Sequence, residues 1–372
     1  MTRSHVLLVV LAACGGSRAT TSDAPVAAID DAADTATLDG AIETPIDAAL
    51  DAAPDAPPPP LGAGWTPLSG VNPSPPGYRY AHAMVYDSMR EQLVMFGGDS
   101  APPYLSDTWV FDGFTWVRKA PAVSPQARGR HAMAFDSGRG RLVLFGGRNF
   151  FFDTFPETWE WDGATWIRLT PAVSPPTLFG AVMAYDAANA RTILFGGSGP
   201  LGLLNDTWAW DGTTWTKLAP AMSPVARTEA AAVYDTARQR IVLFGGASQI
   251  DGNGDGIGDV LGDTWEWTGT TWLPRAPTDA PSPRFAHAMA YDVGRGRTVL
   301  FGGSVSTGTV TSQVNDTWEW DGTSWVRQVT SRQPGVRGNH AMAYVPARAA
   351  VFVYAGLDRQ GISSDLWAFT GL

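Results

Sequence analysis

Residues 131–166 read HAMAFDSGRGRLVLFGGRNFFFDTFPETWEWDGATW, and this stretch decides the fold. Its first five residues alternate bulky and small side chains, the two-residue period of a β-strand. Residues 142–145 are apolar throughout, which is typical of a strand covered on both faces. A third strand is expected at residues 158–161, and Asp162-Gly163 is a type I′ hairpin signal leading to a fourth strand at Thr165-Trp166. We therefore expect four short antiparallel strands.

The same pattern occurs six times, and internal periodicity outweighs any local assignment. The triplet Phe-Gly-Gly begins at Phe96, Phe145, Phe195, Phe244 and Phe301, and Tyr354-Ala355-Gly356 is a degenerate sixth copy. A tryptophan follows each copy, at Trp109, Trp159, Trp208, Trp265, Trp318 and Trp367. Six units of about 50 residues, each with four strands, predict an all-β fold.

These repeats resemble the kelch repeat, whose hallmark is a Gly-Gly doublet followed by a spaced aromatic residue. The resemblance covers residues 64–372 and implies a six-bladed β-propeller of four-stranded kelch-like blades. The third copy departs from the pattern because Leu178 stands where the other copies carry Arg, and Ala181 stands where four copies carry His. Such departures affect individual sites and leave the predicted fold unchanged.

The two ends of the repeat region predict how the ring closes. The last repeat stops after its third strand, at residues 367–369, whereas residues 64–68 match the fourth strand of the second repeat. Pairing the two would complete the last blade and remove the exposed edges of an open ring. The pattern thus predicts an N-terminal fourth strand in blade six.

The N-terminal region predicts a lipid anchor and a tether. Arg3, an apolar run and Leu11-Ala12-Ala13-Cys14 resemble the lipobox of bacterial lipoproteins, so residues 1–13 would be a signal peptide and Cys14 the acylated residue. A chance cysteine in an ordinary signal peptide is the alternative. Residues 14–63 comprise this cysteine and an Ala, Asp and Pro-rich segment that we expect to be disordered. The predicted location is the bacterial cell envelope, extracytoplasmic, at the outer membrane or surface, with membrane contact through the lipid only.

Charge and cysteine content exclude two classes of function. The net charge of −10 lies mostly in the predicted tether, so the repeats carry no basic footprint for nucleic acid. Galactose oxidase-like proteins share the kelch-type fold and use a copper site with a Tyr-Cys crosslink. The only cysteine here is Cys14, outside the repeats, so no copper radical cofactor is expected.

Two recurring positions carry polar side chains. His82, His131, His287 and His340 each follow an arginine by three residues. Imidazoles around a channel would suit a metal, but a recurring blade residue is more typical of a structural role. The arginines are expected to pair with carboxylates or with backbone carbonyls between blades.

The segments between Gly-Gly and the third strand vary most in length, so the face that bears them is the expected binding surface. One of them holds Arg148, Phe150, Phe151, Phe152 and Phe155. Four Phe in one loop predict an exposed aromatic patch for a protein or a glycan. The alternative is that they fold back onto blade two.

A second such segment resembles a calcium loop. Asp251, Asn253, Asp255, Ile257 and Asp259 fall at ligand positions 1, 3, 5, 7 and 9 of an EF-hand-like loop, with the Ile257 carbonyl as one ligand. Position 12 is Gly262 instead of Glu, so a weak Ca²⁺ site is expected. A flexible Gly-Asp insertion is the alternative.

Together these features predict a lipid-anchored binding module of the cell envelope that recognises a protein or polysaccharide through its long-loop face. The alternative is a carbohydrate-active enzyme of the galactose oxidase/kelch-like type that lacks the Tyr-Cys cofactor, and a purely structural envelope component is a third possibility. We find no catalytic motif and expect no enzyme activity.

Overall fold

The computed structural model describes residues 61–68, 75–100, 103–248, 259–306 and 310–371. The chain divides into two units, Met1–Pro58 and Pro59–Leu372, and all described residues belong to the second. None of the helical segments in these described ranges is long and apolar enough to cross a membrane.

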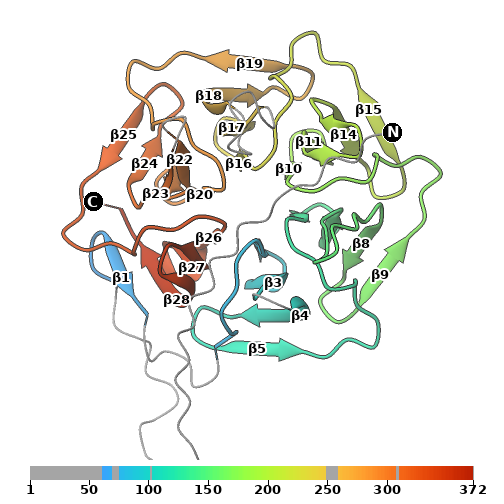
Figure 1. The fold of residues 1–372 in the computed structure, drawn as a ribbon, viewed down its shortest axis with the longest axis horizontal. Coiled ribbons are helices and arrows are strands. Elements are labelled where there is room, and N and C mark those ends of the chain that lie inside the picture. The colour runs from blue at the N-terminus through green and yellow to red at the C-terminus, as the bar shows by residue number, and fades with distance from the viewer. Residues whose placement is uncertain (1–60, 69–74, 101–102, 249–258, 307–309, 372) are drawn as a thin grey trace, which may run out of the picture. The chain divides into compact units, whose positions relative to one another are not determined.

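Six four-stranded antiparallel sheets are arranged in a ring (Figure 1). Blade one holds β2 (Ala83–Asp87), β3 (Gln92–Asp99), β4 (Tyr104–Phe111) and β5 (Trp116–Lys119). Blade two holds β6 (Ala132–Asp136), β7 (Arg141–Phe145), β8 (Thr158–Trp161) and β9 (Trp166–Leu169). Blade three holds β10 (Val182–Asp186), β11 (Arg191–Phe195), β14 (Thr207–Trp210) and β15 (Trp215–Leu218).

Blade four holds β16 (Ala231–Asp235), β17 (Arg240–Ala247), β18 (Val260–Trp267) and β19 (Trp272–Arg275). Blade five holds β20 (Ala288–Asp292), β21 (Arg297–Phe301), β24 (Thr317–Trp320) and β25 (Trp325–Gln328). Blade six holds β26 (Ala341–Val345), the short 3₁₀-helix η1 (Pro346–Arg348), β27 (Ala350–Asp358), β28 (Gly361–Phe369) and β1 (Trp65–Pro67). The predicted all-β, six-bladed propeller is confirmed.

The predicted closure is also confirmed. β1 pairs antiparallel with β28, in the register Trp65 to Phe369 and Pro67 to Trp367. The N-terminal strand thereby completes blade six. The indole nitrogen of Trp65 donates to the Thr317 hydroxyl in blade five at 2.9 Å, which ties the closing strand to a second blade as well.

The core lies between blades, in six clusters of buried apolar side chains. In five of the six seams a fourth-strand tryptophan donates to a third-strand threonine of the preceding blade, as Trp166 does to Thr108 and Trp215 to Thr158. The seam between blades six and one is the exception. Leu366 occupies the threonine position there, and the Trp116 indole nitrogen has no hydrogen-bond partner among the described residues.

Two opposite ends of the central channel follow from the strand directions. The hairpin face is the end where the first strand of each blade turns into the second. The long-loop face is the other end, where the second strand connects to the third.

The connections at the long-loop face were predicted to be loops, and this prediction is only partly right. In blades one, four and six the two strands continue to pair beyond the Gly-Gly position, and in blades three and five they form the small hairpins β12–β13 (Ser198–Gly199, Gly202–Leu203) and β22–β23 (Ser304–Ser306, Thr311–Gln313).

In blades one, four and six the physical reason is a bulge at the Gly-Gly position. In blade one the β3–β4 register shifts between Phe96 and Gly98, and both glycines have positive φ, +64° and +103°. A bulge bends the strand and lets pairing resume beyond it. Gly98 also leaves no room for a side chain, because an added Cβ would lie 2.8 Å from the His82 Cβ.

The predicted type I′ turn at Asp162-Gly163 is wrong in type, although the hairpin exists. Trp161 pairs with Trp166, so the loop comprises residues 162–165. Of the two residues in the motif only Gly163 has positive φ, +101°, whereas a type I′ turn needs two such residues. The Asp162 side chain instead accepts hydrogen bonds from the backbone N–H groups of Ala164 and Thr165 at 2.8 Å, which fixes a longer Asx-type loop.

Candidate functional site

A closed ring of backbone hydrogen bonds surrounds the channel at the long-loop face. In each blade the residue two positions before the first strand has positive φ. Its N–H donates to the carbonyl of the same position in the preceding blade, at 2.8–2.9 Å. The six residues are Ala81, Arg130, Gly180, Glu229, Ala286 and Asn339. Because every blade contributes one donor and one acceptor, the side chains of this ring are held at fixed positions around the axis.

A second ring links each Gly-Gly to the next blade. The second glycine donates its N–H to the carbonyl of the arginine position one blade further on, at 2.8–3.0 Å, as Gly98 does to Arg128 and Gly356 to Arg79. Blade three keeps this bond with the Leu178 carbonyl. Ala355, which replaces a glycine in blade six, retains a positive φ of 60°. The backbone geometry is thus preserved where the sequence departs from the pattern.

The recurring arginines are structural, as expected, but they pair within a blade and not between blades. Each buried guanidinium donates to a backbone carbonyl 18 residues further on at 2.9–3.1 Å and to a carboxylate in the third strand or directly before it. The pairs are Arg79–Asp107, Arg128–Glu157, Arg227–Asp263, Arg284–Asp316 and Arg337–Asp365. Burial opposes ionisation of Asp365, but the hydrogen bond and charge of Arg337, together with hydrogen bonds from Ser363 and Trp367, outweigh it and lower the pKa of Asp365 to about 2.

The four recurring histidines line a small cavity of about 120 Å³ at the axis, together with the residues of the first ring. Both imidazole nitrogens of His82 and His131 are buried without a hydrogen-bond partner among the described residues, whereas His287 and His340 each have a hydrogen bond with a backbone group, at Phe244 and Phe301 respectively. Burial, followed by repulsion from the nearby arginine, lowers the pKa of His131 and His340 to about 3. The imidazoles are therefore neutral, and each offers one donor and one acceptor. Within the described residues no group of three or more His, Cys, Asp or Glu side chains is placed to hold a metal ion.

Two charged side chains cross this cavity. Arg130 of blade two and Glu229 of blade four form an ion pair, and both side chains are largely but not fully buried. Burial and the neighbouring Arg148 lower the pKa of Arg130 to about 10, so it stays charged at neutral pH. Sequence reasoning missed both residues. The signal was present, because these positions hold a small or neutral residue in the other four repeats.

Three of the predicted aromatic residues lie beside this cavity on a loop held by hydrogen bonds of its own. We call residues 149–153 the aromatic finger. The Asn149 side chain accepts from the backbone N–H groups of Phe151 and Asp153 at 2.9 and 3.0 Å and donates to the Asp153 carboxylate. Phe152 has a φ of +64°, unusual for a bulky residue and worth about 1–3 kcal/mol of strain. These bonds fix the finger before any ligand arrives.

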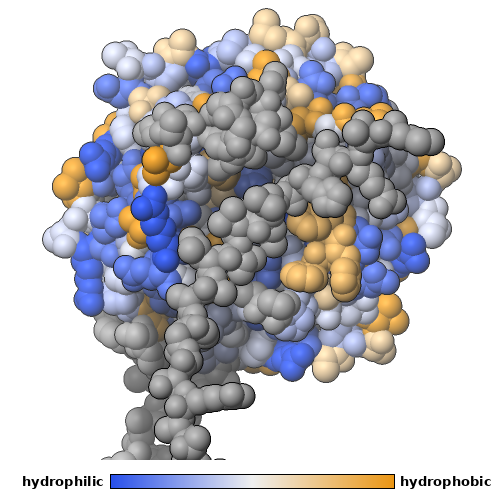
Figure 2. All heavy atoms as spheres, in the orientation of Figure 1, coloured by the Kyte–Doolittle hydropathy of each residue, from blue (hydrophilic) through white to orange (hydrophobic). Residues whose placement is uncertain are grey.

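The finger exposes its aromatic rings. Phe150, Phe151 and Phe152 are 56%, 77% and 64% exposed, so they do not fold back onto blade two. Figure 2 shows one face of the propeller, on which hydrophilic side chains predominate and apolar ones lie in separate patches. Exposed apolar clusters of this kind mark interaction sites.

Arg148 joins the finger to the channel. Its guanidinium lies 4.6 Å from the ring centroid of Phe152 and 4.8 Å from that of Phe179. Its Nε is buried without a hydrogen-bond partner among the described residues. Arg148 is also close enough to Arg130, which lines the cavity, to help lower its pKa, so the finger lies next to the polar cavity.

Phe155 corrects the predicted patch. It is 7% exposed, and the Arg128 guanidinium lies 4.0 Å from its ring centroid. It therefore packs over the buried arginine of blade two as part of the core, because the chain after the finger returns to Gly147 through a backbone hydrogen bond from Phe155. The binding-surface set reduces to Arg148 and the three exposed Phe.

The other predicted site residues lie mostly outside the described residues. This holds for Cys14, Asp251, Asn253, Asp255 and Ile257. Asp259 is described and exposed, and its carbonyl accepts a hydrogen bond from the Ser248 N–H at 2.9 Å. Lipidation of Cys14 and calcium binding by residues 251–259 stay predictions.

Fold and geometry define the class of protein: a closed six-bladed β-propeller with a polar channel end flanked by an aromatic finger. Among solved structures, one titled "Structure of YjhT" is similar over 79% of this chain and 96% of that chain, with a TM-score of 0.59 and 14% sequence identity. At that identity the likeness concerns the fold alone. No protein-family model and no curated protein matches the chain, so the kelch character of the repeats rests on their sequence pattern.

Proposed function

We propose that the protein is a polysaccharide-binding module of the bacterial cell envelope, anchored by a lipid on Cys14, and that it recognises its ligand at the long-loop face. The observation that carries the proposal is the aromatic finger. Three exposed Phe rings are held rigidly next to a cavity lined by neutral imidazoles, an ion pair and Asn339. A binding site fixed in advance loses little conformational entropy when the ligand arrives.

The chemistry suits a sugar chain better than an apolar protein surface. A pyranose ring has apolar C–H faces that stack on aromatic rings, and hydroxyl groups that need donors and acceptors. The finger supplies the rings, and the partly exposed side chains of Arg130, Glu229 and Asn339 supply hydrogen-bonding groups beside it.

The test compares glycan capture by the full chain with capture by a Phe151→Ser, Phe152→Ser double variant. We expect the variant to lose at least about tenfold in affinity, some 1.4 kcal/mol, with an unchanged melting temperature. Leu201→Ser is the matched control, since Leu201 is 100% exposed at the tip of the β12–β13 hairpin. Equal capture by the double variant and the parent would contradict the proposal. Capture of an envelope protein with no glycan bound would favour the protein alternative, and turnover of a glycan would favour the enzyme.

The anchor has its own test. Metabolic labelling with palmitate is expected to mark the parent, and Cys14→Ala is expected to abolish both the label and partitioning into detergent. Palmitate label retained in Cys14→Ala would contradict lipidation at Cys14.

A further inference from the structure

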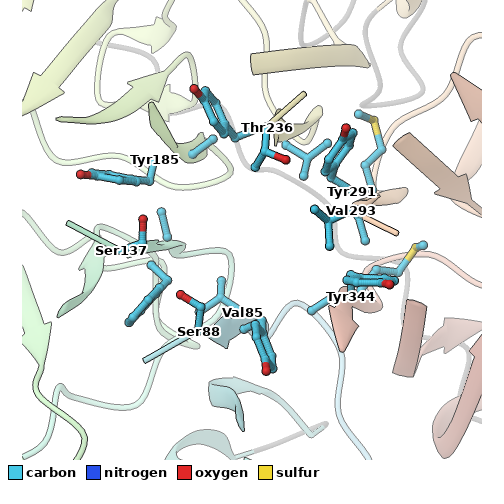
Figure 3. Close-up of a pocket in the computed structure, with 18 of the residues that line it drawn as sticks. Val85, Ser88, Ser137, Tyr185, Thr236, Tyr291, Val293 and Tyr344 are labelled. Carbon is cyan, nitrogen blue, oxygen red and sulfur yellow. The ribbon is translucent and has the colours of Figure 1, made fainter. Parts of the chain in front are cut away.

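A second cavity, of about 450 Å³, lies at the hairpin face, at the opposite end of the channel. We call it the tyrosine cavity. Side chains from the first strands of all six blades line it, and Figure 3 shows them around an open centre. Its volume lies within the range of about 300–1,000 Å³ typical of small-molecule sites.

Three sets of residues, repeated blade by blade, form the wall. The first is aromatic in every blade: Tyr86, Phe135, Tyr185, Tyr234, Tyr291 and Tyr344. The second is methionine in five blades: Met84, Met133, Met183, Met289 and Met342, with Ala232 in blade four. The third lies at the rim and includes the exposed residues Ser88, Ser137 and Ala187. None of the described residues that line this cavity is charged.

The tyrosine hydroxyls are directed away from the cavity and toward neighbouring blades. The Tyr234 hydroxyl accepts from the Ala188 N–H of blade three at 3.1 Å. Burial and hydrogen bonding to Asp136 of blade two raise the pKa of Tyr185, and its hydroxyl points away from the open centre in Figure 3. Because the hydroxyls of Tyr185, Tyr234, Tyr291 and Tyr344 are hydrogen-bonded to the adjoining blade, these side chains leave aromatic carbon as the surface that a ligand would contact.

The methionines add an adaptable apolar lining. They are 5–7% exposed and pack into the seams between blades. Thioether side chains adjust to irregular shapes and make favourable contacts with aromatic rings. A charged ligand would lose its hydration here without gaining a partner, which costs several kcal/mol.

We propose that the tyrosine cavity binds an uncharged small molecule with an aromatic or hydrocarbon ring system. The geometry sets its size. A cavity of about 150 Å³ lined by apolar side chains holds one benzene molecule, so this site accommodates two or three rings. The proposal does not depend on glycan recognition at the long-loop face.

The test titrates the full chain with N-phenyl-1-naphthylamine, an uncharged three-ring probe whose fluorescence rises in apolar surroundings. We expect saturable binding at one site per chain. A Ser137→Trp, Ala187→Trp double variant places bulky side chains at the rim and should weaken binding at least about tenfold. Ala164→Trp, at an exposed hairpin in blade two, is the control and should bind like the parent.

Two further measurements keep the result specific. 8-Anilinonaphthalene-1-sulfonate has the same rings plus a negative charge, and should bind at least about tenfold more weakly. The Phe151→Ser, Phe152→Ser variant should retain probe binding, because the finger lies at the other face. Non-saturable binding, equal affinity for the charged probe, loss of binding in the finger variant, or unchanged binding in the folded rim variant would each overturn the proposal.

Discussion

The two ends of the channel are built from the same six repeats but differ in chemistry. At the long-loop face the six axial residues differ from blade to blade, and they include a charged pair, Arg130 and Glu229, next to neutral imidazoles. At the hairpin face the corresponding positions are almost identical, aromatic in all six blades, and uncharged. Variation on a fixed backbone ring supports selective recognition, whereas repetition yields a uniform apolar wall. The two ends of one channel are thus suited to different ligands, polar at the long-loop face and apolar at the hairpin face.

The largest loss of stability is expected on opening the ring, because both ends of the channel depend on ring closure. Trp65→Ala removes an indole that is 4% exposed, packs between Phe301 and Phe369, and hydrogen-bonds Thr317. We expect a loss of about 3–5 kcal/mol in the free energy of unfolding, measured by urea denaturation. Val329→Ala, at an exposed valine, is the control. A loss in unfolding free energy no larger than that of Val329→Ala would contradict ring closure through β1.

The next prediction compares the stability contributed by one hydrogen-bonded polar side chain at each end of the channel. Arg284→Leu copies blade three, where Leu178 stands, and leaves the Asp316 carboxylate without its buried partner. We expect a cost of about 3 kcal/mol, at the low end for a broken buried pair because Asp316 is 17% exposed. Tyr344→Phe removes hydroxyl hydrogen bonds at the hairpin face and should cost about 1 kcal/mol. Equal losses in denaturation experiments would remove the energetic contrast between the ends.

Acid should act through the histidines of the long-loop face. Their folded-state pKa lies well below the unfolded value of about 6.5, and for His131 and His340 it is about 3. Between those values the unfolded state binds more protons than the folded state, so stability is full above about pH 6.5 and falls as pH drops toward 3. Each histidine contributes a slope of about 1.4 kcal/mol per pH unit. In the double variant His131→Ala, His340→Ala, the free energy of unfolding should depend less steeply on pH, by the amount that corresponds to about two fewer protons bound on unfolding. An unchanged slope would contradict buried neutral imidazoles.

Calcium gives the smallest expected shift. A weak site in residues 251–259 would stabilise the fold by about 1.4 kcal/mol at ten times its Kd, or a few degrees in melting temperature. Calorimetry and thermal melting of the parent and of an Asp251→Ala, Asp255→Ala variant measure it. The absence of heat and of a melting shift at millimolar calcium would exclude the site, and an equal shift in the variant would place the ion elsewhere.

Sequence repetition explains why the fold was predictable. Phe-Gly-Gly, Asp-Thr-Trp and the unmatched strand at residues 64–68 fixed blade number and closure, because each copy supports the assignment of the others. The place of Phe150, Phe151 and Phe152 in a connecting segment left two alternatives open, an exposed patch or packing onto blade two, and the fold shows the rings exposed. Phe155 was not separable from them, because only the fold shows that it lies over Arg128.

The rest depends on contacts between blades that no single repeat contains. Pairing beyond Gly-Gly was missed because a bulge interrupts the local strand pattern without ending the ladder. The Arg130–Glu229 pair joins residues about a hundred positions apart in blades two and four. The tyrosine cavity had a visible signal, since Met and an aromatic residue recur two positions apart, but strand alternation alone does not show that both reach the channel.

Hydrogen exchange of the full chain, with and without a captured polysaccharide, tests most directly whether recognition occurs at the long-loop face. The account predicts added protection at residues 148–155 and around Arg130 and Asn339, with the first-to-second-strand hairpins at Ser137 and Ala187 unchanged. Protection confined to those hairpins, with none at the aromatic finger, would contradict it.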